Sequence, residues 1–186
     1  ALPTMWIGDG NGLLGTVDVA TGTVNVIGSM GQTMTDIAFD PNGNLYGITF
    51  GQLYSINKTT AQSTLIGNTG ASLNSLVFDA TGNLYASNNS LYRLNVSTGA
   101  ASLVGNGGSS YSSAGDLAFV GGQLFLSSST GDNLTRLDTG TGAGQNIGNI
   151  GFSAVYGLAT NDNVTLYGMT GTTVLGINTT TGAGTA

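Results

Sequence analysis

The sequence predicts an all-β fold, a β-propeller of about five four-stranded blades. Three observations predict it. The same short motifs recur at a spacing near 40 residues throughout the 186-residue chain. Each motif is a short apolar run bounded by Gly, Asn or Asp, which is typical of strands joined by tight turns. No window shows a sustained helical period. A 40-residue repeat with four strands is typical of a propeller blade, whereas β-solenoid coils, the alternative, repeat at shorter periods.

An apolar residue followed by an aromatic one marks each repeat. The spacings between successive pairs are 40, 39, 40 and 42 residues, and the pairs are Met5-Trp6, Leu45-Tyr46, Leu84-Tyr85, Leu124-Phe125 and Leu166-Tyr167. Residues at the same place in a repeat occupy the same place in a blade. We therefore expect the four leucines of these pairs to be buried at equivalent positions.

The second repeat shows the four expected strands, which are TDIAFD at 35–40, NLYGIT at 44–49, QLYSIN at 52–57 and STLIGN at 63–68. The third strand of every repeat ends on Asp or Asn, which is followed by two variable residues, then Thr and usually Gly. The side chain of such a residue folds back onto nearby backbone N–H groups and fixes a turn. Turn capping is thus the expected role of Asp18, Asn57, Asn95, Asp138 and Asn178.

The repeats organise the chain into a single propeller domain over residues 1–186. The expected units are about 5–31, 32–70, 71–108, 109–151 and 152–186. The first unit starts directly at its second strand, and the last stops just as its outer strand begins. The first and last blades are therefore expected to be incomplete.

The segments DPNGNLYGIT, DATGNLYASN and LYRLNVSTGAASLVGN resemble secreted bacterial propeller-like repeat proteins, in particular those of the PEP-CTERM type. The resemblance covers essentially the whole chain. It implies a propeller fold and an extracellular location, and it implies no defined activity. The C-terminal sorting signal of that type, a Pro-Glu-Pro motif with an apolar tail and a basic end, is absent from this sequence.

The composition argues against several functions. Three basic residues, Lys58, Arg93 and Arg136, cannot neutralise a run of phosphates, so nucleic acid is not an expected partner. No run approaches the roughly 20 apolar residues that span a bilayer, so no membrane insertion is expected. The chain has no His, Cys or Glu, which leaves little for acid–base chemistry or metal binding. We expect no enzyme activity, no catalytic residues, no metal and no cofactor.

Asp36 and Asp116 depart from the turn-capping pattern of the other aspartates. They begin the first strand of their repeats, where Ser75 and Gly157 stand in other copies. In a propeller this strand lines the central channel, so the two carboxyls are weak candidates for a ligand site there. The simpler interpretation is that water in the channel hydrates the two carboxyls and that they bind no ligand. Aromatic residues near strand ends could instead stack on sugar rings, and these are Trp6, Phe50, Tyr111 and Phe152.

The two incomplete blades favour self-association, because an unpaired strand edge is a template for another chain. Met5, Trp6 and Ile7 at one end, with Gly184 and Thr185 at the other, are the expected contact residues. The chain opens ALPTMW without an initiator Met, which is consistent with a removed signal peptide. The predicted function is thus a non-catalytic secreted structural or interaction protein at the cell surface or in the matrix. It would assemble with itself into oligomers or filaments. The alternatives are a glycan-binding propeller, with extracellular polysaccharide as its partner, and an Asp-based hydrolase.

Overall fold

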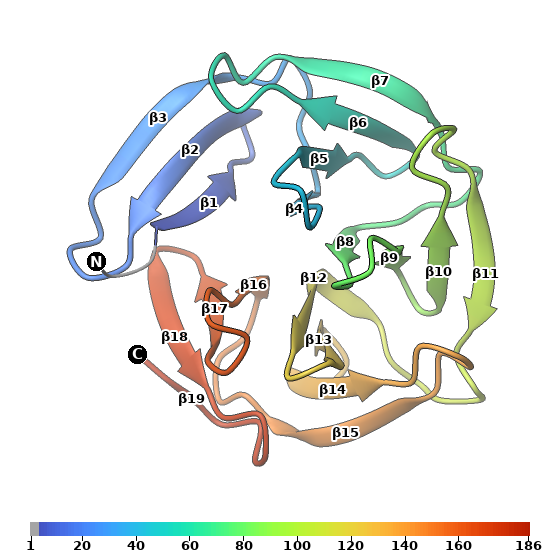
Figure 1. Ribbon diagram of the computed structural model, residues 1–186. Coiled ribbons are helices and arrows are strands. Elements are labelled where there is room, and N and C mark those ends of the chain that lie inside the picture. Colours follow the sequence, from blue (N-terminus) through green and yellow to red (C-terminus); the bar gives the residue numbers. More distant parts are fainter. Residues whose placement is uncertain (1–3) are drawn as a thin grey trace.

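The protein is a ring of five antiparallel β-sheets around a central channel (Figure 1). The computed structural model describes residues 4–186, and no helix occurs within that range. None of the described residues therefore forms a helix able to cross a membrane. The predicted propeller fold with five blades is confirmed.

Each sheet is one blade, and the blades follow one another in sequence order around the ring. The strands of the first three blades are β1 (Thr4–Gly8), β2 (Leu13–Asp18), β3 (Val24–Ser29); β4 (Asp36–Phe39), β5 (Leu45–Ile48), β6 (Gln52–Ile56), β7 (Ser63–Asn68); β8 (Ser75–Phe78), β9 (Leu84–Ser87), β10 (Leu91–Leu94) and β11 (Ala101–Gly105). Those of the last two are β12 (Ser113–Val120), β13 (Gln123–Ser128), β14 (Asn133–Leu137), β15 (Gly144–Asn149); β16 (Val155–Ala159), β17 (Leu166–Thr170), β18 (Thr173–Ile177) and β19 (Gly184–Thr185).

Within residues 4–186, the first blade has no inner strand. It has three strands, β1 to β3, whereas each other blade has four. Met5 on β1 pairs with Val17, just as Leu45 on β5 pairs with Ile56. β1 thus holds the second strand position, and the innermost position, filled by β4, β8, β12 and β16 elsewhere, has no strand of its own blade. The last blade ends in the two-residue β19. The prediction that both end blades are incomplete is confirmed.

The core lies between neighbouring blades. Leu45, Leu84, Leu124 and Leu166 are 2%, 1%, 1% and 1% exposed, as expected from their spacing. Among the described residues, four apolar clusters join the first blade to the second, the second to the third, the third to the fourth and the fourth to the fifth. No such cluster joins the fifth blade to the first within this part of the chain. We call that junction the seam.

The predicted turn caps form after every third strand. The Asp138 Oδ1 atom accepts the N–H groups of Gly140 at 3.0 Å and Thr141 at 2.8 Å. The same two bonds recur at the other four positions, which are Asp18, Asn57, Asn95 and Asn178. The residue four places after each cap has a positive φ, which is why Gly stands there in four copies. The exception is Ala61, with a φ of 65°.

These turns also join the blades at the rim. A glycine in each of the first four outer strands faces the turn of the following blade, and a Cβ atom on Gly67 would collide with the carbonyl oxygen of Thr98. Gly28, Gly105 and Gly148 approach the next turn in the same way. Gly22, in the turn of the first blade, has nothing within 4 Å of a Cβ built there. The rim contact is therefore made at four junctions and is missing at the seam.

We predict that Leu84→Ala lowers the free energy of unfolding by about 2–5 kcal/mol, because it leaves a cavity between two packed blades. Val164→Ala serves as the control, since Val164 is 75% exposed and its truncation should change stability by less than about 0.5 kcal/mol. Urea unfolding followed by circular dichroism measures both. Equal losses in the two variants would contradict the equivalence of blade positions.

Candidate functional site

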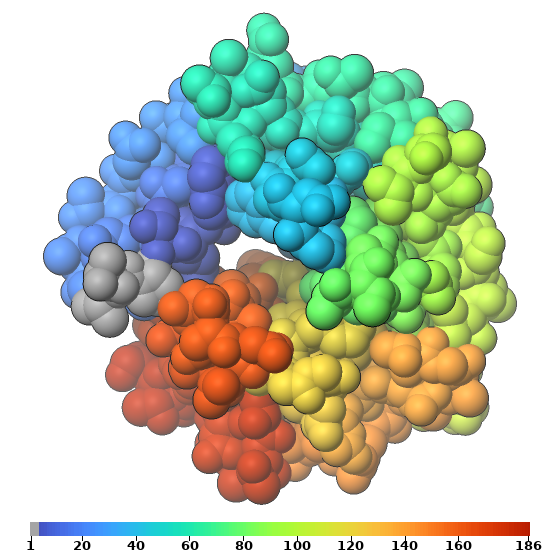
Figure 2. All heavy atoms as spheres, in the orientation of Figure 1, coloured from blue at the N-terminus to red at the C-terminus, as the bar shows by residue number. Residues whose placement is uncertain are grey.

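A cavity of about 600 Å³ lies at the seam, beside the free edge of β1. Its walls come mainly from β1, β4, β16 and β17, that is, from the first, second and fifth blades, with one residue of β12 in the fourth blade. Figure 2 shows the opening at the centre of one face, bounded by these blades. The cavity occupies the region where an inner strand of the first blade would lie, and we call it the seam cavity.

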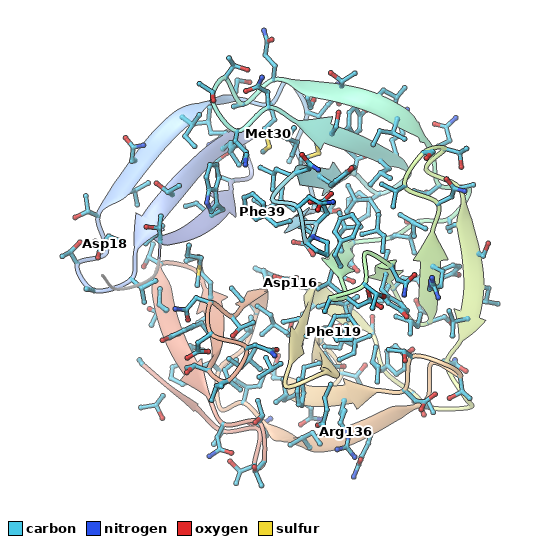
Figure 3. All side chains as sticks on the ribbon, in the orientation of Figure 1. Asp18, Met30, Phe39, Asp116, Phe119 and Arg136 are labelled. Carbon is cyan, nitrogen blue, oxygen red and sulfur yellow. The ribbon has the colours of Figure 1, made fainter. Side chains whose placement is uncertain are left out.

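Asp36 and Asp116 both line the seam cavity, so the structure brings the two predicted channel residues to one place. Asp36 is the first residue of β4 and Asp116 lies within β12. Figure 3 shows Asp116 near the centre of the ring. Their positions follow from the repeat, because the same place in every inner strand faces the channel.

The carboxylate oxygens of this pair accept hydrogen bonds from the backbone of two blades. Asp36 Oδ1 accepts the N–H of Ile37 at 2.7 Å, and its Oδ2 accepts the N–H of Leu76 in the next blade at 2.6 Å. Asp116 accepts in the same way from Leu117 at 2.6 Å and from Leu158 at 2.5 Å. Each aspartate thus fastens its inner strand to the inner strand of the following blade. Sequence reasoning missed this role.

Burial is the main cause that raises the pKa of both carboxyls. It raises the pKa of Asp116 to about 7, against partial lowering by the hydrogen bonds it accepts. The pKa of Asp36 lies well above its ordinary value, through burial first and then through the charge of Asp116 and a hydrogen bond with it. Two buried carboxyls this close cannot easily both ionise, so the pair retains a proton where exposed aspartates have lost theirs.

None of the three basic side chains neutralises the pair. Lys58 donates to the carbonyl oxygen of Gly43 at 2.6 Å, and Arg93 donates to Asn83 at 2.5 Å while its guanidinium lies over the Tyr85 ring. Arg136 bonds to two glutamines of its own blade at the rim (Figure 3). Among residues 4–186, no group of three or more His, Cys, Asp or Glu residues could hold a metal ion.

The predicted self-association residues lie in the first and fifth blades, and those of β1 are at the seam. Met5, Trp6 and Ile7 of β1 line the seam cavity and are half-buried. Trp6 is already packed edge-on against Phe39, with ring centroids 5.4 Å apart. On β19, Gly184 donates its N–H to the carbonyl oxygen of Ile150 at 2.8 Å.

The edges at the seam are only partly paired. Gly184 and Thr185 pair with Ile177 and Gly176, which leaves the rest of β18 without an outer strand in the described chain. β1 pairs with β2 on one side and has no strand of its sheet on the other. The two incomplete edges, β1 and the outer side of β18, belong to the two blades that meet at the seam (Figure 1).

The aromatic residues suggested for sugar stacking are mostly inside the protein. Tyr111 is only 4% exposed, Phe152 packs against the core of the fifth blade, and Trp6 packs against Phe39. Phe50 alone is open, at 62% exposed. The four side chains do not form a common surface, since Phe50 is absent from the lining of the seam cavity.

Two tyrosines of the fifth blade, Tyr156 and Tyr167, line the seam cavity and were not singled out from the sequence as site residues. Tyr156 is 63% exposed. The repeat pattern could have identified both tyrosines, because a blade that is not followed by an inner strand has side chains that no neighbour covers.

Solved structures similar to this chain are β-propeller proteins. A protein of unknown function from Bacteroides thetaiotaomicron matches with a TM-score of 0.68 and 14% identity, over 96% of this chain and 53% of that one. A gluconolactonase from Xanthomonas campestris matches with a TM-score of 0.68 and 16% identity, over 98% and 71%. A chain of a nidogen/laminin complex matches with a TM-score of 0.66 and 14% identity, over 96% and 72%.

These likenesses show the fold alone, because the identities are low and the matched proteins differ in what they do. The chain spans about half the length of the Bacteroides protein. No protein-family model and no curated protein matches the sequence. The comparisons support the propeller fold but not membership of a PEP-CTERM-type family.

We predict that stability falls as the pH rises from about 4 to about 7. In this window an unfolded aspartate, with a pKa near 3.9, has lost its proton, while the folded pair retains one. The folded state therefore binds more protons, and its stabilisation is lost as the pH rises through the raised pKa values. Asp36→Asn should make this decline shallower, because one of the two carboxyls with a raised pKa is gone, while burial still raises the pKa of Asp116.

Thermal unfolding between pH 4 and pH 8 checks this prediction. Asp79→Asn is the control, since hydrogen bonds from Asn83 and Thr81 outweigh burial and lower the pKa of Asp79. That carboxyl is ionised in both states across the window, so the slope should stay as in the wild type. A wild-type curve that is flat or rising over this range would contradict the shared proton.

Proposed function

We propose that this protein is a non-catalytic interaction protein that acts outside the cell and assembles by taking up a β-strand at the seam. The observation that carries the proposal is the free edge of β1 over the 600 Å³ seam cavity. Backbone N–H and C=O groups on such an edge gain hydrogen bonds from an added strand, and the apolar wall beside it gains burial.

The seam is open at two levels of the ring. At the channel, the inner strand position of the first blade is vacant within the described chain. At the rim, Gly22 lacks the glycine contact that the turns of the third, fourth and fifth blades receive. Four junctions of the ring show what a complete junction requires, so the fifth is a surface suited to receive a further polypeptide.

Self-association is the form of assembly that we propose. The edge of β1, with Met5, Trp6 and Ile7, lines the seam cavity, and the short β19, with Gly184 and Thr185, leaves most of the outer side of β18 in the fifth blade unpaired. Pairing between the edges of two different blades is head-to-tail, so it extends into a ring or a filament. The chain is poor in charge, with 6% charged residues, which removes a common obstacle to pairing between edges.

The non-catalytic part of the proposal is supported by the hydrogen bonds of the two buried carboxyls. All four oxygens of Asp36 and Asp116 accept backbone N–H groups. Such bonds hold strands together and occupy the atoms that would act as a base or nucleophile. The separate positions of the candidate aromatics give the glycan-binding alternative no comparable support.

We predict that the wild-type protein forms oligomers whose size grows with concentration, measured by light scattering after size exclusion. Tyr156→Asp puts a charge on an exposed side chain of the seam cavity, where it should oppose strand uptake and raise the concentration needed for assembly about tenfold or more. Val164→Asp adds the same charge to the same blade outside the cavity, and should assemble as the wild type does. The proposal would be wrong if the wild type is monomeric, or if Tyr156→Asp and Val164→Asp change assembly equally.

A further inference from the structure

We propose that the seam cavity is a docking groove for an extended peptide segment of a partner chain with a defined sequence. That sequence is a small or polar residue, then Leu or Ile, then Ala or Val, then Phe. The inference rests on the proposed strand uptake and deepens it by naming the chemistry of the strand. It follows from the four junctions where the equivalent strand is present.

The register of the vacant strand position is set by the repeat. In the second blade Asp36 pairs with Ile48 and Phe39 pairs with Leu45, in antiparallel order. Leu45 and Ile48 correspond to Met5 and Gly8 of β1, since both strands hold the same place in their blades. A docked strand therefore runs antiparallel to β1, with its first residue opposite Gly8 and its fourth opposite Met5.

The fourth position is specified by a series of aromatic pairs between neighbouring blades. Trp6 packs on Phe39, Tyr46 packs on Phe78 and Tyr85 packs on Phe119, with ring centroids 5.4, 5.1 and 5.7 Å apart. In each pair the first ring comes from a second strand, and the Phe lies at or next to the end of the inner strand of the following blade. Figure 3 shows Phe39 and Phe119 at two of these junctions.

Tyr167 holds the same place on the second strand of the fifth blade and lines the seam cavity. The inner strand that would bring a Phe onto its ring is the vacant one. The junction between the fourth and fifth blades differs. Phe125 stands there in place of a tyrosine, and Thr160 of the next blade stands where the other blades have Phe. Each tyrosine with a following inner strand has a Phe partner, so a Phe is the expected residue over Tyr167.

The middle positions follow from burial. The second residue of the inner strand is Ile37, Leu76, Leu117 or Leu158, and it packs in or against an apolar cluster in every case. The third residue is Ala38, Val77, Ala118 or Ala159. A docked strand thus needs a large aliphatic residue and then a small one, in line with the apolar walls of the cavity.

The first position has to be uncharged. Asp36 and Asp116 already place two carboxyls in this cavity, and no basic side chain of the described chain bonds to either. A third acid beside them would add like-charge repulsion in a buried place. Ser or Gly, which the third and fifth blades use at this position, meets the requirement.

The test uses the peptide SLNSLVFDAT, which copies residues 72–81 and carries the β8 version of the pattern. Trp6 is the only tryptophan and lies on β1, so its fluorescence reports occupation of the groove. We expect a saturable blue shift on titration.

The control peptide has Pro in place of Val77. The N–H of Asp79 donates to the carbonyl oxygen of Asn83, in the chain that leads into β9. Every second residue of an antiparallel strand faces the same neighbour, so the N–H of Val77 in β8 also points to β9. Proline removes that donor and should weaken binding about tenfold or more.

A double-mutant cycle tests the aromatic contact. Tyr167→Ala in the protein and Phe78→Ala in the peptide should each weaken binding, and the second change should cost about two- to tenfold less once the first is made. Circular dichroism confirms that the variant protein is folded. Additive effects, or no difference between the Val and Pro peptides, would overturn the sequence assignment even if the protein assembles.

The outcomes separate this inference from the proposed function. Binding with the predicted coupling supports the groove whether or not the wild type assembles. If the peptide also dissolves wild-type oligomers, the donor in those oligomers is a second copy. If the protein is monomeric and yet binds the peptide, self-association fails and a different chain is the donor. No binding to the wild type overturns the groove.

Discussion

The packing of one blade on the next is the constraint on which this structure depends. A four-stranded sheet of about 20 residues cannot bury its own apolar face, so each blade is stable only against a neighbour. Here the junction has three parts. They are an apolar cluster between the sheets, a hydrogen bond or close contact between inner strands, and a glycine of the outer strand against the turn of the next blade. The three junctions between the second and the fifth blade possess all three parts. The junction of the first and second blades has the apolar cluster and the glycine contact, and the seam has none of the three among residues 4–186.

The two buried aspartates are best understood within this scheme. The inner strands line the propeller channel, and some of their backbone N–H groups point away from their own sheet toward the neighbouring blade. Asp36 and Asp116 satisfy such groups on Leu76 and Leu158. The consequence is a pair of buried carboxyls without a cation, and burial raises the pKa of both. We therefore expect the stability of the ring to depend on pH.

Several unusual features of the molecule lie in the two blades that meet at the open junction. The free edge of β1, the exposed ring of Tyr156, the turn at Gly22 and the short β19 all belong to the two blades that meet there. A single missing strand accounts for most of them, since it would have covered β1, filled the cavity and packed on Tyr167. The proposed role in assembly is thus a consequence of incomplete packing between blades and requires no special catalytic chemistry.

The sequence by itself determined the fold. Spacing near 40 residues fixes four strands per unit, and the Leu-Tyr pairs and Asx turns fix their register, because identical local sequences form identical local structure. It also located the incomplete blades. The burial of Tyr111, the packing of Trp6 on Phe39 and the meeting of Asp36 with Asp116 were decided only by the tertiary structure. These contacts join residues from different blades, and their distances depend on how the ring curves. No local pattern carries that curvature, so the cavity and its chemistry could be seen only in the assembled ring.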